Sequence, residues 1–158
     1  MNQKIKTKPR LKKIIRELKQ DGRRVVFTNG CFDILHIGHI RYISRAKKLG
    51  NVLVVAVNTD SSVKRIKGKK RPLVPQDERA SIVAALEDVD FVVLFGESTP
   101  GKLIKYLEPD ILVKGADYKL ADIAGSDTVA GYGGLVKTIP LVKGRSTSNI
   151  ISKIRKSF

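Results

Sequence analysis

The sequence contains one cysteine, no tryptophan, two histidines and no long apolar run. A single cysteine, Cys31, leaves no disulfide within the chain, which suits a reducing compartment and a cytoplasmic location. Without about 18 consecutive apolar residues there is no membrane-spanning helix, and the basic residues before Leu11 lack the apolar centre of a secretory signal. A chain of 158 residues with 42% hydrophobic content has the size of one domain with its own core.

Acidic residues are also scarce, with 15 Asp and Glu against 31 Lys and Arg, which gives a net charge of +16. Such a charge is typical of nucleic-acid-binding proteins, and a basic module of that class is one alternative. However, aromatic residues make up only 6% of the chain and do not alternate with basic ones, as they do where bases are stacked. We therefore expect no specific nucleic-acid partner. The basic residues are dense near the N-terminus, so we assign residues 1–22 to a basic tail and helix and residues 23–158 to the main domain.

Apolar runs that alternate with helical patterns indicate an α/β fold. We predict strands at 24–29, 52–57, 91–95, 111–113 and 135–139, and helices at 9–21, 36–49, 75–87, 100–107 and 146–156. The basic segment 61–74 is predicted to be a mobile loop. Because strands and helices alternate, we expect a Rossmann-like, doubly wound, mainly parallel five-stranded sheet with helices on both faces.

The two histidines lie three residues apart, directly after the first predicted strand. At this spacing on a helix, their Cβ atoms lie about 5–6 Å apart. His36 and His39 would then face the first turn of the helix, where free backbone N–H groups and the helix dipole attract phosphate. Gly38 between them leaves room for a ligand. A metal site is the less favoured alternative because two ligands do not complete a metal shell, and a purely structural role for the histidines is another.

Several segments together resemble the nucleotidyltransferase superfamily with a His-x-Gly-His motif, and within it the adenylyltransferase domains that form ADP-heptose. The resemblance covers roughly residues 20–156. It rests on Thr28–Asp33 with His36–His39, and on Val57–Asp60, Lys67-Gly68, Arg71-Pro72, Ala85–Glu87, Val113–Tyr118, Ile123–Ser126 and Ser146–Ile151. The domain of this family is often fused to a sugar kinase, and this chain contains no kinase segment.

The resemblance implies transfer of AMP from ATP to D-glycero-β-D-manno-heptose 1-phosphate for lipopolysaccharide or another surface glycan. The attacking phosphate is itself a nucleophile, so positioning and charge stabilisation are sufficient for catalysis. A cytidylyltransferase acting on glycerol 3-phosphate or another sugar phosphate is the enzymatic alternative. The implied partners are ATP, a sugar 1-phosphate and a second copy in a homodimer, and Mg²⁺ would bind through the ATP phosphates without a named protein ligand.

The resemblance also implies roles for individual residues. Catalysis would fall to His36, His39 and Lys67, and nucleotide binding to Cys31, Phe32, Gly38, Asp117, Tyr118, Ser146, Thr147 and Ser148. The substrate phosphate would contact Asn29, Gly30, Arg71 and Arg79. Simpler roles stay open: solvated charges at Lys67, Arg71 and Arg79, a turn at Asp117, and helix capping at Ser146. Arg145 departs from the family pattern, and either touches phosphate or adds to the basic surface.

Overall fold

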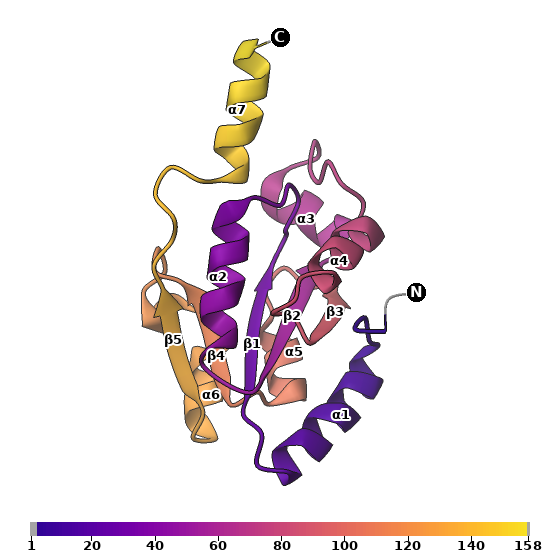
Figure 1. Cartoon of the computed structure of the whole chain (residues 1–158), viewed down its shortest axis with the longest axis vertical. Helices are drawn as coiled ribbons and strands as arrows, with labels where there is room; N and C mark the ends of the chain where they lie inside the picture. Colours follow the sequence, from indigo (N-terminus) through magenta and orange to yellow (C-terminus); the bar gives the residue numbers. More distant parts are fainter. Residues whose placement is uncertain (1–2, 158) are drawn as a thin grey trace.

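The computed structural model describes residues 3–157 and contains one sheet of five parallel strands. Their order across the sheet is β3-β2-β1-β4-β5 (Figure 1), and all four pairings are parallel. This order reverses between β1 and β4, as in a doubly wound fold. The predicted fold class is thus confirmed. The strands are β1 (Val25–Gly30), β2 (Val52–Asn58), β3 (Phe91–Phe95), β4 (Ile111–Gly115) and β5 (Leu135–Ile139).

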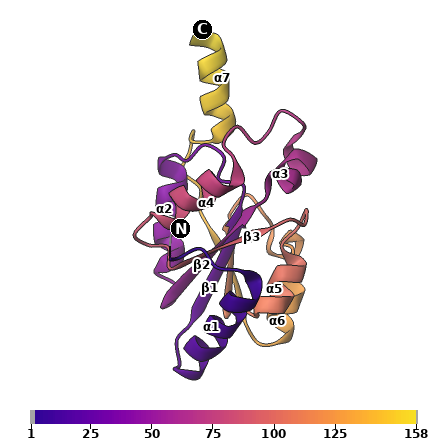
Figure 2. The same ribbon diagram turned by 90° about the vertical axis from the view of Figure 1, so that its right-hand side faces the viewer.

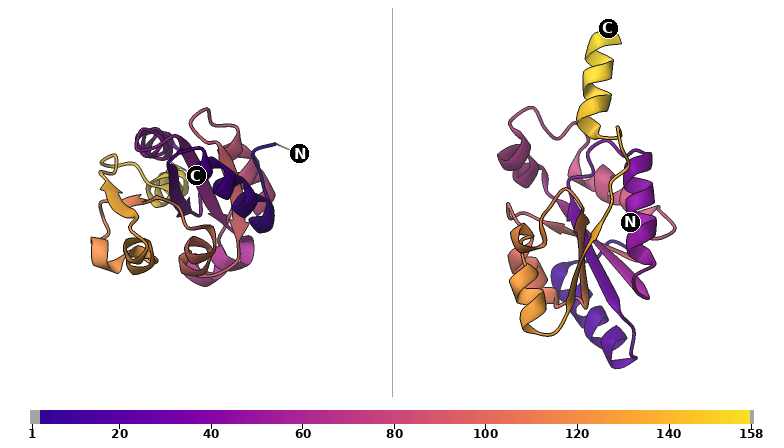
Figure 3. Two further views of the ribbon diagram at one scale, coloured as in Figure 1. Left: turned by 90° about the horizontal axis from the view of Figure 1, so that it is seen from below. Right: turned by 90° about the vertical axis from the view of Figure 1, so that its left-hand side faces the viewer.

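Helices cover both faces of the sheet (Figures 2 and 3). On one face, Ile43 of α2 and Val83 of α4 pack with strand residues in one buried cluster. On the other, Leu11 of α1 and Leu103 of α5 belong to a second cluster. The helices are α1 (Lys8–Gln20), α2 (Ile37–Lys47), α3 (Asp60–Lys67), α4 (Gln76–Ala84), α5 (Gly101–Leu107), α6 (Ser126–Gly131) and α7 (Thr147–Ser157), with a 3₁₀ turn, η1, at Leu120–Asp122.

The N-terminal segment is built into the domain. Lys6 N donates to Val92 O at 2.9 Å, and Val92 N donates to Lys4 O at 2.9 Å. Leu11 and Ile15 are fully buried. Residues 4–6 therefore extend the edge of β3, in contrast to the basic tail expected there. Residues 1 and 2 of the predicted tail lie outside the described residues.

The segment predicted as a loop at 61–74 begins as helix α3. Thr59 caps it by accepting a hydrogen bond from Ser62 N at 3.4 Å, and Val63 is buried beneath it. Its last turn carries Lys64, Arg65 and Lys67, whose charges suit the negative end of the helix dipole. The loop proper is the shorter stretch that follows Gly68.

Helix α7 projects beyond the carboxyl ends of the strands (Figure 1) and has no buried residue. The spacing of Ile150, Ile151 and Ile154 predicts that they face the core, but Ile154 is 52% exposed, so this prediction is wrong. The helical spacing likewise predicts an inward Ile82 in α4, and Ile82 is exposed. Ser98 and Thr99 are the residue types expected to cap α5, but its N-cap is Pro100, without a side-chain hydrogen bond. No helix within residues 3–157 is long and apolar enough to cross a membrane.

Candidate active site

The first turn of α2 holds the two histidine rings in one fixed arrangement. His36 Nδ1 accepts a hydrogen bond from Gly38 N at 3.1 Å, and His39 Nδ1 accepts one from His36 N at 3.4 Å. The ring centroids lie 3.9 Å apart with an interplanar angle of 31°. Because both Nδ1 atoms accept, the proton of each neutral ring is on Nε2. The pair therefore presents two N–H donors beside the backbone N–H groups of the helix start.

Both rings are neutral at pH 7. Burial, followed by the neighbouring His36, lowers the pKa of His39 to about 4. Burial, followed by the charge of Arg145, also lowers the pKa of His36. Neutral imidazoles keep their Nε2–H donors and add no charge that would have to be desolvated. The predicted pairing of His36 and His39 at one spot is confirmed as geometry, whereas their catalytic role stays a prediction.

Gly38 allows this ring arrangement. A Cβ atom at Gly38 would lie 2.8 Å from Cε1 and Nδ1 of His36 and 3.4 Å from Cβ of Arg145. The start of α7 approaches the same place, because Thr147 Oγ1 donates to Ile34 O at 3.3 Å. Arg145 thus lies at the histidine site.

The three residues at the start of α7, Ser146, Thr147 and Ser148, differ in their contacts. Ser146 Oγ accepts from Asn149 N at 3.1 Å, so Ser146 does cap α7. Ser148 is exposed. The contact of Thr147 with Ile34 attaches the triplet to the loop before α2. Nucleotide binding by these three residues stays a prediction.

The loop after β1 is tightly turned against the histidines. Phe32 has a positive φ of 49°, which is uncommon for a bulky residue and marks a constrained turn. Its ring lies 5.3 Å from that of His39, and a Cβ at Gly30 would lie 3.0 Å from Cε2 of Phe32. Burial raises the pKa of the Cys31 thiol, which favours the neutral form and agrees with a backbone role for Cys31.

Asp33 joins this loop to the segment before α4, a role that was not predicted from the sequence. Its carboxylate accepts from Leu73 N at 2.8 Å and Val74 N at 2.9 Å, and pairs with Arg71 Nε at 2.5 Å. Burial alone would raise the pKa of Asp33, but these hydrogen bonds lower it overall. Arg71, predicted to bind a substrate phosphate, is thus oriented by Asp33.

Arg79 requires a correction. We predicted a contact with substrate phosphate, but the side chain is 0% exposed. Its Nε donates to Val74 O at 2.8 Å, Nη1 to Cys31 O at 2.5 Å, and Nη2 pairs with Asp60 Oδ1 at 2.7 Å. All three nitrogens of the guanidinium therefore bond to protein atoms. Arg79 is a buried brace behind the loop after β1.

The remaining predicted residues lie around the same edge of the sheet. Lys67 is exposed at the end of α3, and its charge reaches Cys31, whose pKa it lowers in opposition to burial. Asp117 and Tyr118 are exposed after β4, where Tyr118 N donates to Gly115 O at 3.1 Å. Their roles stay predictions. Lys114, the last residue but one of β4, was not predicted although it is the one charge in that apolar strand.

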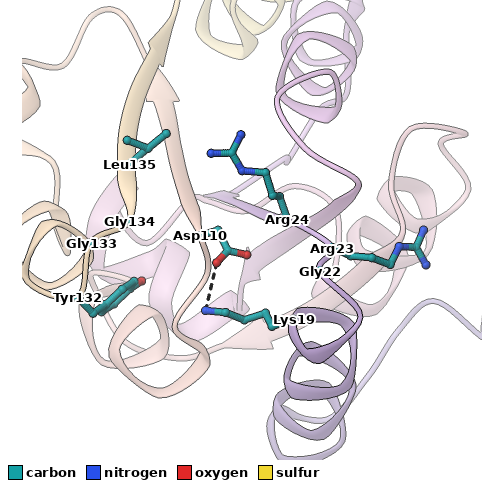
Figure 4. Close-up of a pocket in the computed structure, with 9 residues that line it drawn as sticks. All are labelled: Lys19, Gly22, Arg23, Arg24, Asp110, Tyr132, Gly133, Gly134 and Leu135. Carbon is teal, nitrogen blue, oxygen red and sulfur yellow. Dashed lines mark ion pairs between the residues drawn. The ribbon is translucent and has the colours of Figure 1, made fainter.

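A pocket at the opposite edge of the sheet differs from the histidine site, because an ion pair crosses it (Figure 4). Lys19 and Asp110 meet across it at 3.2 Å, and Asp110 also accepts from Val25 N at 2.8 Å. Figure 4 shows Arg23 extending away from the pocket. These polar groups hold α1 to the sheet, so we place the active site at the carboxyl edge. Within residues 3–157 no three His, Cys, Asp or Glu side chains gather in a way that could hold a metal ion.

Paired imidazole donors at a helix N-terminus, at the reversal point of a parallel sheet, have the chemistry expected of a phosphate site. Comparison with known proteins agrees with this chemistry. The cytidylyltransferase-like family matches residues 27–153. The chain belongs to this family and is a nucleotidyltransferase.

Among individual relatives, the bifunctional protein HldE of Geobacter sulfurreducens is 51% identical over 155 residues, which cover 98% of this chain and 32% of that protein. HldE of Citrifermentans bemidjiense is 56% identical over 137 residues, covering 87% of this chain and 28% of that protein. This chain thus spans about a third of the length of these relatives.

Two solved structures are similar. The lipopolysaccharide core biosynthesis protein of Thermoplasma volcanium is 34% identical with a TM-score of 0.64, over 78% of this chain and all of that one. Pantoate-β-alanine ligase of Francisella tularensis has a TM-score of 0.65 at 19% identity, over 96% of this chain and 78% of that one. The second likeness concerns the fold alone.

Proposed function

We propose that the protein transfers AMP from ATP to D-glycero-β-D-manno-heptose 1-phosphate, which gives ADP-heptose and pyrophosphate. The observation that carries the proposal is the pair of neutral Nε2–H donors at His36 and His39. The similarity to HldE and to a lipopolysaccharide core biosynthesis protein supports the heptose substrate. ATP is supported by the resemblance of the segment Val113–Tyr118 to the ADP-heptose-forming domains.

The chemistry needs no activated side chain. An oxygen of the sugar phosphate attacks the α-phosphorus of ATP in line, the new P–O bond forms, and the bond to the pyrophosphate oxygen breaks. His36 and His39 donate to the phosphate oxygens on which charge develops, and Lys67 adds a positive charge from α3. Mg²⁺ would neutralise charge on the triphosphate. Asp33 and Asp60 are already bonded to Arg71 and Arg79, so we expect Mg²⁺ to be held by the triphosphate and water.

The test distinguishes the role of each histidine as an Nε2–H donor from its role as an Nδ1 acceptor at the start of α2. In His36→Asn or His39→Asn, the amide oxygen replaces Nδ1 as the capping acceptor, while the Nε2–H donor is lost. We expect pyrophosphate release to fall by about 10²–10³-fold at an unchanged unfolding temperature. Activity within about twofold of wild type in both variants would contradict the assigned role.

A cytidylyltransferase is the second candidate, because the matching family carries that description. The same assay with CTP in place of ATP, and glycerol 3-phosphate in place of the heptose, decides between them. Turnover with CTP alone would overturn the adenylyl proposal. Tight, specific nucleic-acid binding at about 200 mM salt, with no turnover of either nucleotide, would favour the basic binding module.

Two further expectations belong to the same proposal. A homodimer is expected, and sedimentation of the whole chain at two concentrations tests it. Cytoplasmic location is expected for an enzyme that uses ATP, and fractionation of the source cells tests it.

A further inference from the structure

Asn29 and Lys114 are neighbours at the point where the strand order reverses. Phe27 of β1 pairs with Leu112 of β4, and both side chains belong to the buried cluster beneath α1 and α5. Because side chains alternate along a strand, Asn29 and Lys114, each two residues further on, lie on that same face. Lys114 Nζ donates to Asn29 O at 3.3 Å. Ligands of open parallel sheets bind at such a reversal point.

Lys114 is a partly buried lysine whose charge has no ion-pair partner among the described residues. No ion pair within residues 3–157 includes it, whereas Lys8, Lys12, Lys19 and Lys47 all have one. Burial lowers its pKa to about 8, against the opposing influence of Cys31 and Asp117. Its second contact is with the ring of Tyr118, 5.6 Å from Nζ to the ring centroid. A cation placed in this way destabilises the fold unless an anion joins it.

Asn29 requires a hydrogen-bond donor, whereas Lys114 requires an anion. Its Oδ1 is buried and has no hydrogen-bond donor among residues 3–157. An acceptor in that state costs about as much as a lost hydrogen bond, and only a donor satisfies it. A phosphate alone would serve Lys114 but not Asn29 Oδ1, so the two groups together fit a ligand that carries a phosphate and a nearby hydroxyl.

We propose that Lys114 and Asn29 form the subsite for the attacking sugar phosphate, with Lys114 Nζ on a phosphate oxygen and Asn29 Oδ1 accepting from an adjacent sugar hydroxyl. The assignment rests on the proposed function. A sugar 1-phosphate carries its phosphate and a hydroxyl on neighbouring carbons. In ATP the nearest ribose hydroxyl is separated from the phosphate-bearing carbon by a further ring carbon, so a phosphate and a hydroxyl on neighbouring carbons are a property of the sugar phosphate.

The experiment compares Lys114→Met with a matched loss of one charge, Lys137→Met. Lys137 is exposed on the edge strand β5. We expect Lys114→Met to raise the KM for heptose 1-phosphate about tenfold or more, because a charge-assisted hydrogen bond is lost. The KM for ATP should stay within about twofold. Lys114→Arg should restore part of the loss, and Lys137→Met should match wild type in both constants.

A stability measurement separates substrate binding from a structural role. A partly buried charge without an ion-pair partner destabilises the folded state, and Lys114→Met removes that charge. The unfolding temperature of Lys114→Met should therefore equal or exceed that of wild type. A lower unfolding temperature together with an unchanged KM for the sugar phosphate would overturn the proposal. So would a rise in the KM for ATP alone.

A substitution at Asn29 tests whether the phosphate lies beside both residues. Asn29→Asp keeps the shape of the side chain but places a carboxylate beside Lys114, which neutralises the cation and repels phosphate. We expect the KM for heptose 1-phosphate to rise in this variant too, and an unchanged value would contradict the subsite.

Failure of this subsite is distinguishable from failure of the proposed function. A wild-type protein that releases no pyrophosphate from heptose 1-phosphate and ATP contradicts the function. An active wild type with an equally active Lys114→Met contradicts only the subsite. For an inactive wild type, calorimetric titration with mannose 1-phosphate gives the readout, and equal affinities of wild type and Lys114→Met overturn the subsite.

Discussion

The two walls of the candidate site are built very differently. On one wall, the loop after β1 is fixed from behind by Arg79, which bonds to Cys31 O, and from the side by Asp33, which bonds to Leu73 and Val74. On the other wall, α7 has no buried residue, and Thr147 Oγ1 donates to Ile34 O at 3.3 Å. The first wall is thus organised before any ligand arrives. We expect the second wall to be completed by the substrate.

The largest effect should come from breaking the braced wall. Arg79→Met removes a buried cation and leaves Cys31 O, Val74 O and Asp60 without their donor. We expect the free energy of unfolding to fall by about 3 kcal/mol, measured by urea denaturation. The control Arg41→Met, at an exposed position of α2, should change it by less than about 0.5 kcal/mol. Equal stability of the two variants would show that the brace is dispensable.

A smaller effect should follow from crowding the histidines. In Gly38→Ala the new Cβ would lie 2.8 Å from the His36 ring, so the ring has to move. We expect kcat/KM to fall about tenfold, since about 1.4 kcal/mol of positioning is lost. Gly131→Ala is the matched control, because nothing lies within 4 Å of its Cβ position. If both variants keep full activity, the ring position is not critical.

Lowering the pH should reduce the stability of the protein, because His39 is partly buried beside the loop after β1. The folded pKa of His39, about 4, lies below its ordinary value of 6.5. The unfolded chain therefore takes up a proton as pH falls from 6.5 towards 4, while the folded chain does not, and stability falls over this window. Urea unfolding at pH 7, 6 and 5 should show this decline, and His39→Asn should show a shallower one by up to about one proton. The same slope in both proteins would refute the assignment.

The smallest effect should come from the open wall. Thr147→Val removes only the hydroxyl contact with Ile34 O, which is long at 3.3 Å and lies at a partly exposed position. We expect the free energy of unfolding to change by less than about 0.5 kcal/mol, again by urea denaturation. A loss of more than about 1 kcal/mol would mean that α7 contributes to the core after all, and would remove the contrast between the two walls.

The sequence predicts correctly those features that depend on residues close together in the chain. Apolar runs such as Val52–Val57 located the strands, and the three-residue spacing of His36 and His39 sufficed to place both rings at one spot. Local patterns failed where a role depends on distant atoms. Nothing near Arg79 indicates that Cys31, 48 residues away, accepts its hydrogen bond.

The other errors concern helices that bury few residues. Helix α3 buries only Ser62 and Val63, so its sequence resembles a solvated loop. In α7 the spacing of Ile150, Ile151 and Ile154 is that of a core-facing helix, but the chain leaves the body of the domain before it begins. Periodicity reports that a face is apolar and does not identify what covers it.

The two histidine rings at the start of α2 have a structural role and, in the proposed function, a second role toward the ligand. Nδ1 of each ring accepts a backbone N–H at the helix start, and Nε2 of each ring is the donor that we propose for phosphate. An evolving sequence therefore cannot adjust substrate affinity at these two positions without also changing how the helix begins. Substitutions that change substrate affinity alone are therefore expected at neighbouring residues. Each histidine is constrained twice, by the hydrogen bond of Nδ1 and by the proposed contact of Nε2.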